Sequence, residues 1–140
     1  MVVVDGKGIP LGGLIASASP AEVTLLEATL ATIQVPREGP GRPRSKPARV
    51  IADRAYDSDP HRERLALRGI ELIVPFRKHR RWPGIQDRRP LRRYRKRWKI
   101  ERTNAWISAS RRLVIRYDHE TAHYQAFFYI ACAMITLRWL

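Results

Sequence analysis

Short apolar segments alternate with segments of helical periodicity along this sequence, and the alternation limits the folds open to the chain. Strand-type runs are expected at residues 1–4, 11–16, 48–52 and 70–74. The pair Asp5-Gly6 after the first run predicts a hairpin, because its turn needs residues that tolerate positive φ. Helical segments follow, which gives the order β-β-α-β-α-β-α-α. This order favours an α/β domain with some parallel pairing.

The length of the chain, 140 residues, is that of one domain, and 44% apolar residues are enough to fill a core. Residues 36–47 (PREGPGRPRSKP) interrupt the pattern with proline, glycine and basic side chains. We expect a solvated basic loop there, within a single domain 1–140. The single cysteine, Cys132, excludes an internal disulfide and a cysteine-rich zinc site.

The charge of the chain indicates a polyanionic partner. Lys and Arg number 27 against 13 acids, a formal net charge of +14, so nucleic acid is the first expectation and an anionic membrane the second. Residues 77–102 hold 13 Lys or Arg and two acids. The aromatic residues Phe76, Trp82, Tyr94 and Trp98 are interleaved with them. Phosphates supply affinity and bases stack on aromatic rings, which favours a nucleic-acid surface over a merely solvated face.

The apolar C-terminal segment is too short to cross a membrane. Gln125 and Arg138 bracket it, and a membrane helix needs roughly 20 apolar residues. No secretory signal is visible, because the first apolar residues are followed at once by Asp5. We therefore expect no membrane partner and a cytoplasmic location.

Asp53 directly follows the buried-type strand at 48–52, in the segment IADRAYDSD. Open α/β sheets place their chemistry beyond the carboxyl ends of strands, so this position favours a functional site. A loop acid or a helix cap is the ordinary alternative. The nearby Asp57 and Asp59 fit turn and cap roles better than a site.

A basic helix expected over residues 89–113 carries a single acid, Glu101. Tyr94, Arg97 and Glu101 stand at i, i+3 and i+7, so they share one face, and the adjacent Trp98 suggests that this face turns inward. Glu101 could simply pair with Arg97 on the helix surface. A carboxylate among so many arginines favours a metal ligand instead, because Mg²⁺ takes a few hard carboxylates and completes its shell with water and substrate phosphates.

These residues together resemble the C-terminal part of a bacterial insertion-sequence transposase of the DDE (Asp-Asp-Glu) type. The segment DRAYDSD is similar to the family's second-aspartate segment, Asp-x-Gly/Ala-Tyr, which makes Asp53 that aspartate. The segment YRKRWKIE is similar to its Tyr-x2-Arg-x3-Glu signature, with Tyr94, Arg97 and Glu101 at the required spacing. The opening VDGKGIPLG and the tail RRLVIRYD…FFYIACAMI also resemble the family, so the resemblance covers essentially the whole chain.

The resemblance implies an RNase H-like catalytic domain that cleaves and joins transposon-end DNA by two-metal phosphodiester chemistry. It implies that Asp53 and Glu101 are catalytic ligands of Mg²⁺, with Mn²⁺ as an alternative. It implies double-stranded DNA, both transposon ends and target, as the partner, with Tyr94 and Arg97 holding the end phosphate. The wider set expected to contact DNA is Arg93, Lys96, Trp98, Arg111 and Arg112.

Two departures from the family pattern bear on activity. The family usually has Lys or Arg seven residues after the glutamate, where this chain has Ser108, so Arg111 or Arg112 would have to supply that phosphate contact. The first aspartate of the family lies on a strand that would precede Met1. In the RNase H-like order 3-2-1-4-5 that strand is central. The resemblance therefore implies an incomplete domain, with a gap in its sheet and unpaired edges on both sides.

The resemblance leaves two functions open. The chain could be an enzyme that cleaves and joins DNA only with an upstream transposase portion or in a homo-oligomer, or a non-catalytic DNA-binding remnant or regulator of the full-length transposase. A basic RNA-binding or ribosome-associated protein would explain the charge but not the spacing of Asp53, Tyr94, Arg97 and Glu101. We expect a bacterial cytoplasmic protein that is nucleoid-associated when bound to DNA.

Overall fold

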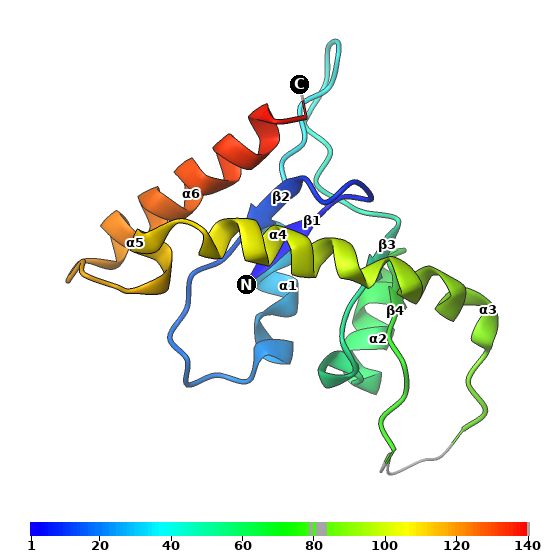
Figure 1. Ribbon diagram of the computed structural model, residues 1–140. Coiled ribbons are helices and arrows are strands. Elements are labelled where there is room, and N and C mark those ends of the chain that lie inside the picture. The colour runs from blue at the N-terminus through cyan, green and yellow to red at the C-terminus, as the bar shows by residue number, and fades with distance from the viewer. Residues whose placement is uncertain (79, 81–83, 140) are drawn as a thin grey trace.

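The computed structural model describes residues 1–78, 80 and 84–139, so Trp82 lies outside the described residues. The strands are β1 Val2–Val4, β2 Pro10–Gly13, β3 Arg49–Ile51 and β4 Glu71–Ile73. The α-helices and the 3₁₀ helices (η) are η1 Glu22–Leu25, α1 Leu26–Ala31, η2 Arg54–Tyr56, α2 Asp59–Leu67, α3 Arg88–Leu91, η3 Arg92–Arg97, α4 Trp98–Ser108, α5 Arg111–Val114 and α6 Thr121–Leu137. The mixed α/β class predicted from the sequence is confirmed (Figure 1).

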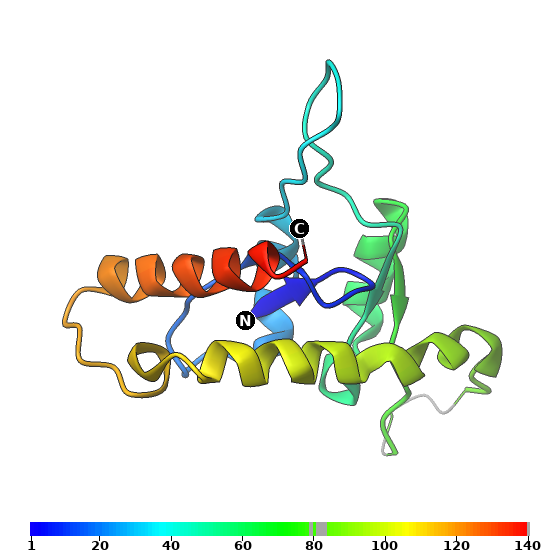
Figure 2. The same cartoon turned by 45° about the horizontal axis from the view of Figure 1, so that its top comes forward.

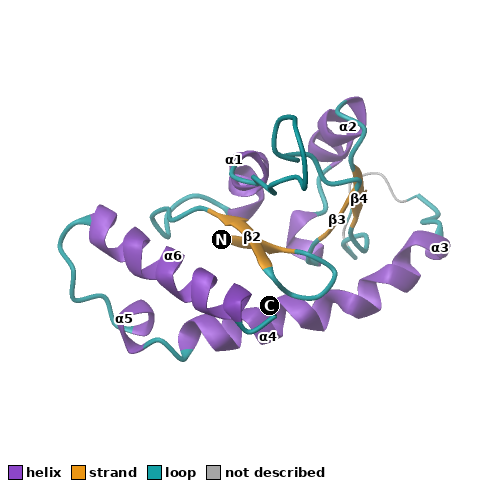
Figure 3. Ribbon diagram, turned by 90° about the horizontal axis from the view of Figure 1, so that it is seen from above, coloured by secondary structure: helices purple, strands orange, loops and turns teal. Residues whose placement is uncertain are grey.

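The strands form two separate two-stranded sheets. β1 and β2 make an antiparallel hairpin, whereas β3 and β4 pair in parallel, with Val50 opposite Leu72. Among the described residues no ladder joins β1 to β3, and the two sheets lie apart in the view from above (Figure 3). Asp5 holds the hairpin turn as expected, because its Oδ1 accepts hydrogen bonds from the backbone N–H groups of Lys7 and Ile9, each at 2.8 Å.

The main core lies between the β3–β4 sheet and the two helices α1 and α2. Leu30, Leu65, Ile70 and Val74 are almost completely buried there. The parallel pairing follows from α2, which carries the chain from the end of β3 back to the start of β4. This connection leaves the residues directly after β3 at the edge of the core, where polar side chains reach solvent.

A cluster of charges joins α1 to α2. The Glu27 carboxylate accepts a hydrogen bond from Arg64 Nε at 2.7 Å and lies 3.0 Å from His61 Nδ1. The hydrogen bond from Arg64 lowers the pKa of Glu27 below its ordinary value of 4.5, against the opposing effect of desolvation. The ionised carboxylate therefore stabilises the folded state.

We expect a Glu27→Gln variant to be less stable than the unaltered chain at pH 7, by about 1 kcal/mol, because the ion pairs are partly exposed. The lowered pKa means that this contribution is present above pH 4.5 and is lost as the pH falls through the folded-state value. Urea unfolding of both proteins from pH 7 to pH 3 should show the two stability curves converging in acid. Glu63→Gln, on the exposed side of α2, is the matched control. A constant difference down to pH 3 would contradict the prediction.

The helix α6 covers the other side of the hairpin. It packs against α4 and β2, and Gly13 makes this packing possible, because a Cβ there would lie 2.4 Å from the Phe128 ring. Phe128, Ala131 and Ile135 are buried on this side. No helix in the described part of the chain is long and apolar enough to cross a membrane.

The basic helix expected over residues 89–113 is broken into shorter elements. α3, η3 and α4 follow one another without a gap from Arg88 to Ser108, with 3₁₀ geometry in the middle. The helix then ends, because Ser110 is extended (φ −83°, ψ 102°), and α5 begins separately at Arg111. The prediction of one continuous helix to residue 113 is therefore wrong at its C-terminal end.

Candidate active site

The hairpin turn of the β1–β2 sheet is fastened to α4. Thr103 is completely buried, and its hydroxyl donates to the carbonyl of Gly8 at 2.7 Å. Arg102 Nη2 donates to the carbonyl of Lys7 at 2.5 Å, and Lys99 Nζ donates to that of Gly6. Three successive turn carbonyls thus accept from one turn of α4. These bonds set the position of Glu101, which lies between Lys99 and Arg102 in the sequence.

Arg97 brings Asp53 and Glu101 together. Its Nη1 lies 3.5 Å from Asp53 Oδ2, and its Nη2 lies 2.5 Å from Glu101 Oε1. Asp53 follows β3 and Glu101 lies on α4, so the two carboxylates come from distant parts of the sequence and meet on one guanidinium. The surface ion pair between Arg97 and Glu101, the simpler interpretation from the sequence, forms as well.

The prediction that the helix face with Glu101 turns inward is wrong. The side chains of Asp53 and Glu101 are 53% and 56% exposed, and Trp98 is also exposed. The face of α4 that turns inward carries Ile100 and Thr103 instead. The two carboxylates therefore lie at the edge of the molecule, where a phosphate backbone and hydrated ions can reach them.

The other candidate DNA-contacting residues divide into two groups. Tyr94 is half-buried, with the Arg97 guanidinium 5.7 Å from its ring centre, and Arg93 and Lys96 are exposed on η3. The Trp98 ring lies 5.0 Å from the Arg102 guanidinium. Arg111 and Arg112 are exposed on α5, which lies at the other end of α4 from α3 (Figure 1). They are not grouped with Asp53 and Glu101.

Tyr56 anchors the short segment that follows Asp53. Its ring is buried, and its hydroxyl donates to Glu22 Oε2 at 3.0 Å. Burial raises the pKa of Tyr56, and the carboxylates of Glu22 and Asp53 raise it further, so the hydroxyl stays protonated. This bond ties η2 to the start of the first helical segment.

Asp57 also holds this segment, in a role that the sequence did not indicate. Its side chain is only 2% exposed, and it accepts from Arg62 Nη2 at 2.9 Å and from the backbone N–H of Arg77 at 2.8 Å. Arg62 in turn donates to the carbonyls of Leu72 and Val74 at the end of β4. Asp57 is thus the centre of a buried network and not a surface turn residue.

Arg77 completes the network from the opposite side. Its Nε donates to the carbonyl of Arg54 at 3.2 Å, and its Nη2 donates to that of Ala55. The residues directly after Asp53 are therefore held through their backbone by Arg77 and through Asp57 by Arg62. The side chain of Asp53 is half-exposed, so packing does little to fix it. The contacts of the residues that follow it therefore set its position.

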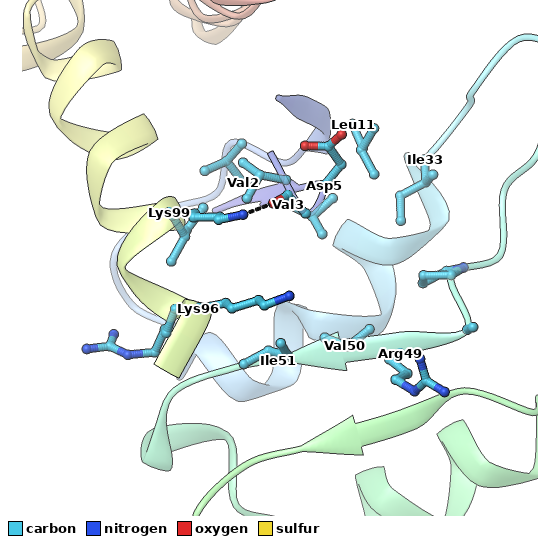
Figure 4. A pocket seen from close by; sticks show the side chains of 16 residues that line it. Val2, Val3, Asp5, Leu11, Ile33, Arg49, Val50, Ile51, Lys96 and Lys99 are labelled. Atoms are coloured by element: carbon cyan, nitrogen blue, oxygen red, sulfur yellow. Dashed lines mark hydrogen bonds between the residues drawn. The ribbon is translucent and has the colours of Figure 1, made fainter. Parts of the chain in front are cut away.

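A cleft separates the two sheets. It has a volume of about 430 Å³, with β1 on one side, β3 on the other and the helix from Lys96 to Ile100 along it. Figure 4 shows Lys96 and Lys99 reaching from this helix toward the cleft, and the apolar side chains of Val3, Ile33 and Val50 around it. A second hollow of about 220 Å³ continues the cleft toward Asp53 and Tyr56. The two share Val2, Val3, Val50, Ile51, Arg97 and Ile100.

The chemistry of the site is that of two carboxylates and a guanidinium, of which Asp53 and Arg97 line the second hollow. Oxygen ligands of this kind suit Mg²⁺ or Mn²⁺. Within residues 1–78, 80 and 84–139, no third His, Cys, Asp or Glu joins them to form a group that could hold a metal ion. Asp53 and Glu101 are thus two oxygen ligands that could contribute to a metal site, without a third among the described residues.

Sequence reasoning missed the residues that support the site. Asp57 and Arg62 stand five residues apart across a helix start, and nothing in their spacing distinguishes a buried pair from two surface charges. Thr103 offered a weak signal, since it is a small polar residue beside Glu101 in a helix otherwise rich in long charged side chains.

Comparison with known proteins gives the family. The family model described as "Transposase DDE domain" matches residues 1–136. The chain belongs to the DDE transposase family. A curated relative, the putative transposase for insertion sequence element IS402 of Burkholderia cepacia, is 36% identical over 134 residues. No solved structure matches the chain.

The match to the IS402 relative covers 96% of this chain but 60% of the relative. The chain thus spans about 60% of the length of that protein. The insertion-sequence DDE transposase family predicted from the DRAYDSD and YRKRWKIE segments is confirmed.

Proposed function

We propose that this chain is the C-terminal part of a transposase catalytic domain that cleaves and joins transposon-end DNA, with Asp53 and Glu101 as two of its three metal ligands. The observation that carries the proposal is the convergence of both carboxylates on Arg97. Asp53 precedes Arg97 by 44 residues and Glu101 by 48, so the tertiary fold is what brings the two carboxylates to one guanidinium.

Each residue has a defined role in this proposal. Asp53 and Glu101 supply oxygen ligands to Mg²⁺, or to Mn²⁺. A bound metal pair activates the attacking water or 3′-hydroxyl and stabilises the leaving oxygen of the phosphodiester. Arg97 binds the phosphate of the transposon end through its fork of donors, supported by the Tyr94 ring. The exposed Arg93 and Lys96 add contacts to the backbone of the same duplex.

In this proposal a further strand of the domain would lie in the cleft between β1 and β3. Both strands have one paired edge and one edge toward the cleft, and an extended segment between them would join the two sheets into one. The spatial order would be β2, β1, the added strand, β3 and β4, which is the RNase H-like order. A strand parallel to β3 would end near Asp53, where a third carboxylate would complete the metal site.

A cleavage assay tests whether the chain needs this strand. The unaltered chain, and the chain fused to the part of the IS402 relative outside the matched region, are incubated with an insertion-sequence end duplex and Mg²⁺. We expect strand cleavage from the fusion alone. Cleavage by the 140-residue chain that Asp53→Asn abolishes would overturn the view that the domain is incomplete.

Hydrogen exchange supplies a readout that does not depend on activity. An added strand would pair with β1 and β3, so the backbone amides of residues 2–4 and 49–51 should exchange more slowly in the fusion than in the unaltered chain. The amides of β4, which already pairs with β3, serve as the internal control. Unchanged exchange at β1 and β3 would rule out strand addition in the cleft.

A second function is favoured by the finding that no third metal-binding residue joins the two acids within the described ranges. On its own, the chain would then bind DNA without cleaving it, as a remnant or as a regulator of the full-length transposase. Duplex binding by the unaltered chain together with inactivity of the fusion would support this alternative.

A further inference from the structure

The basic loop at residues 36–47, here called the basic finger, projects from the body of the protein away from α3 and α4 (Figures 1 and 2). Between residues 37 and 46 it has no aliphatic or aromatic side chain apart from proline. It carries Arg37, Arg42, Arg44 and Lys46 against one acid, Glu38. A segment of this composition contributes nothing to the core, and its chemistry suits contact with a polyanion.

The backbone of the finger is held in shape. Val35 and Arg44 exchange two hydrogen bonds, from Val35 N to Arg44 O at 2.9 Å and from Arg44 N to Val35 O at 2.8 Å. At the tip, Gly39 and Gly41 have φ of 138° and 132°, which other residues rarely adopt. Prolines restrict the rest. The bridge at the base and the prolines limit the conformations of the finger, which lowers the conformational entropy that it loses when it binds a partner.

The cations of the finger are available and regularly spaced. None of the four takes part in an ion pair within the described part of the chain. Arg42, Arg44 and Lys46 occupy alternate positions, and alternate residues of an extended segment face the same way, roughly 7 Å apart. That spacing is about twice the 3.4 Å rise between successive phosphates of a DNA strand.

The finger and the candidate active site lie at opposite ends of β3. The finger ends at Pro47, just before the strand, whereas Asp53 follows it. Six residues of extended chain span about 20 Å along β3, and the finger continues beyond Pro47 (Figure 1). The separation is therefore on the order of one turn of duplex DNA, roughly 34 Å.

We propose that the basic finger binds the phosphate backbone of duplex DNA about one helical turn away from the phosphate at Asp53 and Glu101. The inference rests on the proposed DNA-binding function and adds a second contact region to it. The finger would lengthen the bound stretch of DNA and fix its direction relative to the site, without reading the bases.

Salt-dependent binding tests the proposal. The affinity of the chain is measured over a range of salt concentrations for a random-sequence duplex of 30 base pairs and for a hairpin duplex of 6 base pairs, which is only about 20 Å long. Each phosphate contact contributes about 0.9 to the slope of log K against log salt, so Arg42→Gln/Arg44→Gln should reduce the slope by about 2 on the longer duplex. The reduction should largely disappear on the shorter one, which cannot reach both regions. Arg42→Lys/Arg44→Lys should retain the slope.

Arg116→Gln/Arg138→Gln is the matched control, because it removes the same charge from exposed positions near α5 and after α6. An equal change of slope in the control would show a general charge effect and overturn the proposal. An undiminished reduction on the 6-base-pair hairpin would also overturn the proposal. So would tighter finger-dependent binding to single-stranded RNA of 30 nucleotides. If the unaltered chain binds no duplex, the proposed function itself fails. If it binds with a slope that the finger variant leaves unchanged, only the finger proposal fails.

Discussion

A Glu101→Gln variant of the chain fused to the remaining part of the IS402 relative is expected to lose Mg²⁺-dependent cleavage of the end duplex by about 10³-fold or more. The amide keeps the shape of the side chain but removes the charge that a metal ligand needs. The fold should survive, since the ion pair with Arg97 is exposed and contributes about 1 kcal/mol or less. Single-turnover cleavage with saturating enzyme measures the loss directly.

Glu120→Gln is the matched control, because Glu120 is exposed just before α6 and lies 3.8 Å from its ion-pair partner His123. This variant should cleave like the unaltered fusion. Duplex affinity should change little in Glu101→Gln, because the phosphate contacts come from Arg97 and the other cations. A Glu101→Gln variant that retains cleavage within tenfold would remove Glu101 from the metal site, and with it the main argument for catalysis.

Asp57→Ala is expected to destabilise the protein by about 3–5 kcal/mol, which is the largest stability effect that we predict for a single polar residue. The substitution leaves Arg62 without its carboxylate partner in a position that is mostly buried. It also leaves the backbone N–H of Arg77 without its acceptor. Urea unfolding followed by circular dichroism gives the change in the free energy of unfolding.

Glu71→Ala provides the comparison, because the pair between Arg49 and Glu71 has a similar length, 2.8 Å, but is 51% and 43% exposed. Its loss should change the free energy of unfolding by about 1 kcal/mol or less. Asp57→Asn, which keeps the acceptor oxygen for Arg77, should fall between the two alanine variants. Equal stability of the Asp57→Ala and Glu71→Ala proteins would show that the buried network does not hold the segment after Asp53.

The local sequence was sufficient to predict the strands and the family, but not the break in the basic helix after Ser108. Apolar runs bounded by turn residues located all four strands to within a few residues, since a strand needs a short stretch of apolar side chains. Asp5 was correctly expected in the hairpin turn, but the positive φ lies at Gly8 and not at Asp5 or Gly6, and Asp5 acts by accepting backbone hydrogen bonds. The Tyr94, Arg97 and Glu101 spacing, together with DRAYDSD, identified the transposase family, because a signature of this kind depends only on the order of residues.

Only the tertiary structure decided which side chains meet. Arg97 could be assigned to Glu101 from helical spacing, but its contact with Asp53 depends on how α4 crosses the end of β3. That crossing is set by Thr103, Arg102 and Lys99, which bind the hairpin turn at the other end of the sequence. The burial of Asp57 and the cleft between β1 and β3 are likewise long-range results. Periodicity reports which face of an element is apolar, whereas burial and pairing depend on where distant elements pack.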